Sequence, residues 1–398
     1  MQRIFNGKRL KEARLFNQYT ITALSKELEV SKQMVSKYEN LNSQPSKETL
    51  FKISNLLKFP TEFFMTEDNS SIASNGLYFR SYLTSTQKEK EPATYWLKYA
   101  LIIKEYLNQY VDFPDLKNTD SITESIDLQS SNLTLNDIEK IAQHVRELLD
   151  YNDQPIENMV EFAELLGITV INNNGFSEKV DAFSSRYSIG DNNYFVISIP
   201  SEGTFFRQQF SIAHEIGHWI LHEGMDPQEL EKDEYKLMEQ DANNFASCLL
   251  MPAERFTKDV ENTGTHFESF LILKKRWNVS VSSMIMRSYQ LGLITSIEKQ
   301  SLFKHMSYKG YRKLEPFDKE TKVNKPVAIR QAMKLLDDNN VRTGAEIRDE
   351  LAEKYNLYLN LEFLSQVTDL PKQFFMDNRE SGVVLSIKDN YNSKSKLQ

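Results

Sequence analysis

The sequence predicts a mostly helical α+β protein that is divided into several domains. Apolar residues recur at helical spacing through most of the chain, starting with a series of short helices over residues 6–64. Three runs of β-branched and aromatic residues lie together between residues 168 and 199 and predict a small sheet. The chain has 398 residues, which exceeds the length of one typical domain.

The first 66 residues predict a domain of five short helices with a helix-turn-helix at residues 20–40. Its inward-facing positions hold Leu24, Leu28, Val30, Val35 and Tyr38. Ser31 is expected to cap the second helix of the motif. The outer side of that helix can enter a major groove, where Gln reads base edges and Lys reaches phosphates. The expected DNA contacts are Ser31, Lys32, Gln33, Ser36 and Lys37. The alternative is a helical module for dimerisation or protein contact that has lost DNA binding.

The charge distribution favours nucleic acid contact through this domain alone. The whole chain has a net charge of −8, yet residues 1–66 hold 11 Lys and Arg against 6 Glu. A basic N-terminal domain on an acidic body suggests that any double-stranded DNA binds to residues 1–66.

Residues 67–132 predict a linker region with one long helix. Residues 66–76 are polar and rich in turn-forming residues, so they are expected to be the linker itself. Residues 95–107 are apolar nearly all round, which predicts a helix buried between domains or at a dimer contact. Residues 114–132 are polar and predict a loop.

The middle of the chain predicts two helices followed by the sheet. The helices are expected over residues 136–149 and 157–166, and Gly167 stops the second. The strands are expected at residues 168–171, 182–187 and 194–199, directly before a strongly apolar helix around residues 210–222.

That apolar helix carries the pattern His214-Glu215-x-x-His218. Residues four apart share one helix face, so both imidazoles can reach one metal ion. Glu215 points about 100° away, which suits a general base that contacts a metal-bound water. Gly217 suggests a close approach by another segment. The alternative is a pair of core histidines that are hydrogen-bonded to their neighbours.

A catalytic zinc site needs a third protein ligand. The downstream candidates are His222, Glu223 and the acidic residues of a second helix that ends near residue 250. On that helix Glu239 and Asn243 lie four apart, whereas Asp241 points elsewhere. We therefore expect Glu239 as the third Zn²⁺ ligand and Asn243 as a group that supports the site.

The rest of the chain predicts further helices. Residues 263–316 predict a helical unit that is similar to a second helix-turn-helix. We expect this unit to pack against the rest of the protein and not to read DNA bases. Its Lys274-Lys275-Arg276 could contact phosphates. Residues 317–377 predict a helical region with two helices, and Thr343-x-x-Glu346 is a capping box for the second. Residues 378–398 are polar and predict a disordered tail.

Composition favours a cytoplasmic protein without membrane contact. No apolar run approaches the length of about 20 residues that spans a membrane, and the N-terminus lacks the apolar core of a signal peptide. One cysteine, Cys248, excludes an internal disulfide framework.

Two stretches carry a family resemblance: His214-Glu215-Ile216-Gly217-His218 and Glu239-x-x-Ala242-Asn243-x-Phe245-Ala246, continued by Leu249-Leu250-Met251-Pro252. Together they resemble the ImmA/IrrE family of zinc metallopeptidases, and residues 1–66 resemble the XRE-type helix-turn-helix, with Glu29 in place of the usual turn glycine. The resemblance covers residues 1–316 and implies a zincin-like metallopeptidase domain at residues 133–262. In that fold a sheet edge lines the cleft, and an extended substrate can pair with it.

The resemblance implies a bacterial or phage-borne, cytoplasmic DNA-binding regulator with zinc-dependent endopeptidase activity. Its expected substrate is a specific regulatory protein such as a repressor, and a homodimer on a double-stranded DNA operator is expected. The alternative is a DNA-binding transcription regulator whose zincin-like domain is a non-catalytic sensor or interaction module.

Overall fold

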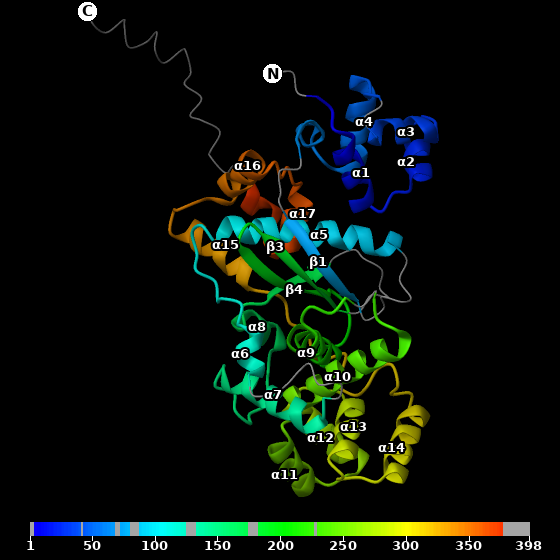
Figure 1. Cartoon of the computed structure of the whole chain (residues 1–398), viewed down its shortest axis with the longest axis vertical. Helices are drawn as coiled ribbons and strands as arrows, with labels where there is room; N and C mark the ends of the chain where they lie inside the picture. Colours follow the sequence, from blue (N-terminus) through cyan, green and yellow to red (C-terminus); the bar gives the residue numbers. More distant parts are fainter. Residues whose placement is uncertain are drawn as a thin grey trace, which may run out of the picture.

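The computed structural model describes residues 4–40, 43–67, 72–79, 87–124, 133–173, 182–226 and 229–376. Figure 1 shows the N-terminal helices at one end, a sheet in the middle and helices α11 to α14 at the other end. Two hydrophobic cores hold the chain together: one joins the N-terminal helices to the long helix and the C-terminal helices, and the other lies below the sheet. No helix within the described ranges is long and apolar enough to cross a membrane.

The N-terminal domain consists of α1 (Gly7–Phe16), α2 (Ile21–Glu27), α3 (Lys32–Glu39), α4 (Lys47–Leu57) and the 3-10 turn η1 (Thr61–Met65). The predicted cap of α3 is confirmed, because the Ser31 hydroxyl accepts a hydrogen bond from the Met34 N–H at 3.1 Å. Glu29 lies in the turn before α3 with φ +56°, the left-handed conformation that glycine adopts more easily.

Helix α3 is held against α1 from two sides. The Arg14 guanidinium makes a two-pronged ion pair with the Glu39 carboxylate, at 2.5 and 3.0 Å, and both side chains are buried. Gly7 begins α1 beside the end of α3, and a Cβ there would collide with the Tyr38 carbonyl. These contacts bury one side of α3 and leave its N-terminal end in solvent.

The sheet has four strands in the order β1-β3-β4-β2. They are β1 (Ile72–Phe79), β2 (Thr169–Asn173), β3 (Phe183–Ile189) and β4 (Asn192–Pro200). Strand β3 pairs antiparallel with β1 and β4, whereas β2 and β4 are parallel. The three predicted strands are confirmed. Residues 66–76 were expected to be a linker, but residues 72–76 belong to strand β1. The turn-forming Asn75-Gly76 lies within the strand, at the register shift between Ser74 and Leu77.

Helices cover both faces of the sheet (Figure 1). The long helix α5 (Gln87–Leu107) lies on one face, where the Trp96 indole donates to the Asn172 carbonyl at 3.0 Å and Lys104 Nζ donates to Thr169 Oγ1 at 2.8 Å. Helix α9 (Phe205–Leu221) lies on the other face. Strand alternation explains both contacts: on β4, Val196 enters the core shared with α5, and Ile197 enters the core shared with α9.

Helices α6 (Thr119–Thr123), α8 (Met159–Leu165) and α10 (Lys232–Leu250) pack against α9, and α7 (Leu135–Glu147) packs against α10. The series continues with α11 (Ala253–Thr263), α12 (Phe267–Trp277), α13 (Val281–Gln290) and α14 (Ser296–Tyr308). Helix α6 lies within residues 114–132, which were expected to form a loop without a helix. The suggestion that Lys274 contacts phosphates was wrong, because its ammonium is fully buried, 2.6 Å from Asp318 and 2.8 Å from Glu315.

The C-terminal region contains α15 (Ala328–Asp338), α16 (Gly344–Tyr355), α17 (Leu361–Thr368) and the 3-10 turn η2 (Lys372–Phe375), one α-helix more than expected. The capping box at Thr343 is confirmed. Phe363 on α17 packs against Phe16 of α1 and Trp96 of α5, so three distant segments share one core. The predicted tail, residues 378–398, lies outside the described residues.

Candidate metal centre

Helix α9 holds the predicted metal residues inside the protein. Thr204 caps its N-terminus, and His214, Glu215 and His218 are each at most 1% exposed. Polar groups buried this deeply require partners, since unpaired burial is costly. The partners come from α10 on one side and from β3 on the other.

Gly217 allows α10 to approach α9 closely. A Cβ at position 217 would lie 3.2 Å from the Ala242 Cα and carbonyl oxygen and 3.1 Å from the Phe245 ring. The close approach anticipated from the sequence is therefore present, and the approaching segment is α10. This packing places Glu239, three residues before Ala242, opposite the two histidines.

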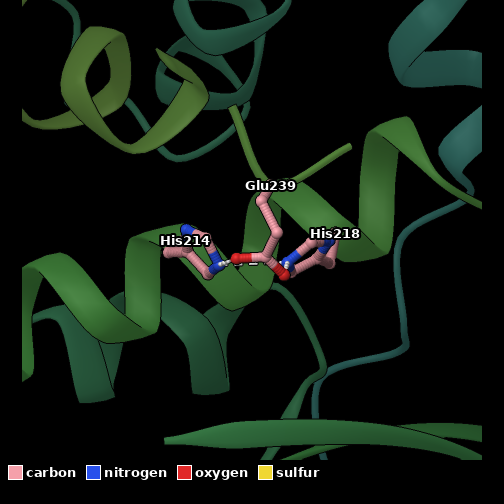
Figure 2. A group of neighbouring side chains, drawn as sticks. All are labelled: His214, His218 and Glu239. Carbon is pink, nitrogen blue, oxygen red and sulfur yellow. Dashed lines mark hydrogen bonds and ion pairs between the residues drawn. The ribbon is translucent and has the colours of Figure 1, made fainter. Parts of the chain in front are cut away.

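Three side chains converge at this crossing (Figure 2). The Nε2 atoms of His214 and His218 are 3.0 Å apart, and each lies 3.5 Å from one oxygen of the Glu239 carboxylate. Tetrahedral zinc with bonds of about 2.0–2.1 Å needs ligand atoms roughly 3.3 Å apart. The three groups fit one zinc ion, and they are the candidate metal ligands among the described residues.

Two further side chains orient the histidines. The amide oxygen of Asn243 lies 3.1 Å from His214 Nδ1, so it can accept the Nδ1–H and leave Nε2 free for a metal. His222 Nδ1 lies 3.1 Å from His218 Nδ1. The structure thus places His222 behind His218, away from the ligand group. The other two candidates, Glu223 and Asp241, also lie outside the ligand group. Glu223 forms an ion pair with Arg186. Asp241 is half-buried, and this burial raises its pKa to about 6.

The electrostatics at Glu239 favour a carboxylate. Burial acts to raise its pKa, but hydrogen bonds and charge from His214 and His218 outweigh burial and lower it. An ionised carboxylate beside two imidazoles is a ligand set for a borderline-soft divalent cation such as Zn²⁺.

Glu215 is not one of the three candidate ligands, and it forms a hydrogen bond with the sheet. Its Oε2 accepts a hydrogen bond of 2.5 Å from the hydroxyl of Ser184 on β3. Sequence reasoning gave Ser184 no role of its own. The available signal was alternation along the strand, because Ser184 and Arg186 face α9 while Phe183 and Tyr187 enter the core shared with α5.

A cavity of about 590 Å³ adjoins the ligand group. Glu239 and Asn243 form one wall, Ser283 and Met286 of α13 form another, and Phe210 is also among its lining residues. Hydrolysis also needs a group that stabilises the reacting oxygen, and Arg207, near the start of the metal helix, is conceivable from the sequence. Arg207 is not among the residues that line this cavity. It is exposed on α9 about 10 Å along the axis before His214, which does not favour it as a group that stabilises a reacting oxygen at the metal.

Replacing Gly217 with valine should disrupt the crossing. The branched side chain would press on the Ala242 backbone, so we expect a loss of about 1–3 kcal/mol in the free energy of unfolding and weaker zinc binding. Denaturant unfolding and zinc titration measure the two effects, with Lys232→Val on exposed α10 surface as the control. Unchanged values for both would contradict a tight crossing.

The predicted DNA-contact residues are the N-cap of α3 and four residues of that helix. Ser31, Lys32, Gln33 and Lys37 are exposed, and Ser36 is half-buried. The lone cysteine lies elsewhere: Cys248 is buried on α10, and burial raises the pKa of its thiol.

Comparisons with known proteins identify two regions. Residues 163–289 match the family described as "IrrE N-terminal-like domain", and residues 10–64 match the family described as "Helix-turn-helix". A "Mycobacterium tuberculosis transcriptional regulator" of known structure is 15% identical over 42% of this chain and 50% of that chain, with a TM-score of 0.28. This chain thus matches half the length of that protein. No curated protein matches the sequence.

Proposed function

We propose that this chain, in which an XRE-type helix-turn-helix domain is joined to an IrrE-type metallopeptidase-like domain, is a cytoplasmic DNA-binding regulator with zinc-dependent endopeptidase activity. The observation that carries the proposal is the convergence of His214, His218 and Glu239 within 4.8 Å, beside a separately held Glu215. A structural histidine pair would need only hydrogen-bond partners, whereas the two Nε2 atoms and the Glu239 carboxylate oxygens lie 3.0–3.5 Å apart, the spacing that one tetrahedral ion requires.

The chain's own residues have distinct roles in the proposed hydrolysis. His214, His218 and Glu239 would hold a zinc ion, which when bound lowers the pKa of water and polarises the scissile carbonyl. Glu215 takes the proton from the attacking water and delivers it to the leaving amine. The Ser184 hydroxyl orients the Glu215 carboxylate, and Asn243 orients the His214 ring.

The proposed substrate is a specific regulatory protein such as a repressor. The cavity of about 590 Å³ beside Glu239 can receive side chains next to the scissile bond. A DNA-binding domain in the same chain would raise the effective concentration of the peptidase near a target bound to the same operator.

A non-catalytic regulator is the alternative, and one observation favours it. The helix-turn-helix domain shares a hydrophobic core with α5 and the sheet that borders the metal site, so metal binding alone could alter DNA binding. The two functions differ at Glu215, because a metal sensor does not need a general base.

A substrate trap tests the proposal. The zinc-loaded Glu215→Gln variant should retain a protein that the wild type releases, and the wild type should then cut that captured protein at one site. The matched control is His214→Ala, which should neither retain nor cut it. A captured protein that the wild type leaves intact would favour the non-catalytic regulator.

DNA binding is proposed for residues 1–66, and Lys32 is proposed to contact phosphate. The variant Lys32→Ala should reduce the slope of log K against log salt by about one, because one phosphate contact releases about 0.9 counterions. Binding titrations at several salt concentrations measure this slope on double-stranded operator DNA. Lys334→Ala, an exposed lysine on α15, is the control. Equal slopes for wild type and Lys32→Ala would contradict the contact.

A further inference from the structure

Strand β3 is the part of the sheet that contacts the proposed catalytic groups. The Ser184 hydroxyl donates to Glu215, and the Arg186 guanidinium donates to the Trp219 carbonyl at 2.8 Å. Both partners lie on α9, on either side of His218. The backbone of β3 therefore runs alongside the metal helix.

The two edges of β3 have different neighbours. One edge pairs with β4, which continues to β2 inside the sheet. The other edge pairs with β1, the outermost strand, formed by residues that follow the helix-turn-helix domain (Figure 1). Without β1, the backbone N–H and C=O groups on this edge of β3 would be open beside the metal site.

An open edge of this kind is where an extended peptide binds by adding a strand, because its main chain supplies the hydrogen bonds. Strand β1 already occupies this edge in the way that an added peptide strand would. It runs antiparallel to β3, and Tyr78 is the backbone partner of Ser184, the residue that holds Glu215. The chain therefore places one of its own segments at the edge where a substrate would pair.

The pairing of β1 is interrupted. Its register shifts between Ser74 and Leu77, so residues 75 and 76 break the ladder into two short parts. The opposite edge strand β2 pairs without interruption over five residues, and side chains of α5 bond it directly. An edge strand whose ladder is interrupted can separate from the sheet in parts, at lower cost than a continuous strand of the same length.

Pairing of an extended substrate with the edge of β3 is already expected from the zincin-like fold. We infer that in this chain β1 occupies that edge as a resident competitor, which must leave before a protein substrate can bind. This inference rests on the proposed peptidase function. A tethered competitor acts at an effective concentration in the millimolar range, so it would exclude weakly binding peptides and admit only a target with additional contacts. Because β1 follows the helix-turn-helix domain in the chain, movement of that domain would also affect the pairing of β1 with β3.

A reversible disulfide tests this inference. Ala73 of β1 and Ser188 of β3 are backbone partners, and directly opposite residues of antiparallel strands lie close enough for a disulfide. The double variant Ala73→Cys/Ser188→Cys, loaded with zinc, is compared before and after reduction with a phosphine. Two probes are used: acetohydroxamate, which needs only the metal, and a short peptidyl hydroxamate, which also needs the strand edge.

We expect the disulfide to change the affinity for only one of the two probes. The oxidised variant should bind acetohydroxamate as the reduced variant does, but bind the peptidyl hydroxamate at least about tenfold more weakly. Ser188→Cys alone, oxidised in the same way, is the control. Equal peptidyl hydroxamate affinity in the oxidised and reduced forms would overturn the role of β1 and leave the peptidase proposal intact. Failure of acetohydroxamate to bind zinc-loaded wild type would overturn the peptidase proposal, and the role of β1 with it.

A second variant tests the opposite direction without a cross-link. The double variant Ala73→Pro/Ser74→Pro should weaken the pairing of β1, because the N–H groups of consecutive residues face opposite edges of a strand, so that one of the two prolines removes a hydrogen bond to β3. The peptidyl hydroxamate should then bind at least about threefold more tightly, with acetohydroxamate binding unchanged. Unchanged or weaker binding of the peptidyl probe would contradict the competitor role.

Discussion

Replacing His214 with alanine should abolish stoichiometric zinc binding. The wild type should hold about one zinc per chain, because two imidazoles and one carboxylate stand at distances that suit a tetrahedral ion. Glu239→Gln should have a similar effect, since a neutral amide replaces the ionised carboxylate. We expect affinity losses above about 100-fold in both variants, more than loss of a supporting hydrogen bond normally causes.

Metal analysis of purified protein and zinc titration calorimetry measure these losses. Zinc at about 1,000 times its Kd should stabilise the wild type by about 4 kcal/mol and leave His214→Ala nearly unchanged. Asn243→Ala should show an intermediate loss of about 10–100-fold, because it removes the hydrogen bonds to the His214 ring and to the Glu239 backbone carbonyl but none of the three ligands. Affinity should also fall as pH is lowered, because protons compete with zinc for the ring nitrogens.

One control and one outcome make this prediction decisive. Asp241→Asn changes a carboxyl on the same helix outside the ligand group, so it should bind zinc like the wild type. A wild type that stays folded and free of metal after zinc is offered would contradict the ligand set. The non-catalytic regulator would then be the better account of the chain.

Replacing Glu215 with glutamine should separate zinc binding from peptide hydrolysis. The side chain bonds to Ser184 and is not one of the three ligands, so zinc content should stay at the wild-type level. The rate of hydrolysis should fall by about 10²–10⁴-fold, the usual contribution of a general acid–base group. The measurement is single-site cleavage of the trapped substrate, followed by mass spectrometry at matched zinc content.

Ser184→Ala is the matched control for this second prediction. It keeps the Glu215 carboxylate but removes its partner, so the rate should fall less than in Glu215→Gln. Its pH profile should also shift, because the hydrogen bond from Ser184 to the carboxylate is lost. Wild-type rates in Glu215→Gln would exclude Glu215 as the general base, whatever the zinc content.

Short-range patterns were sufficient for much of the fold. Ser31 and Thr343 were recognisable as helix caps because a cap needs only the next three residues. The strands after residue 168 were recognisable from β-branched and aromatic runs. The pattern failed at β1, where Asn75-Gly76 reads as a turn and pairing with distant β3 overrides the local preference.

In the candidate site, too, some features follow from local sequence and others depend on long-range packing. The sequence by itself determined that His214 and His218 share one helix face, because residues four apart must do so in any α-helix. The facing of Glu239 depends on the α9–α10 crossing at Gly217, and the placement of His222 behind His218 depends on the end of α9. Only the tertiary structure decided that Ser184 holds Glu215 and that β1 covers the neighbouring edge. These contacts join segments far apart in the chain, and packing of the whole fold sets their distances.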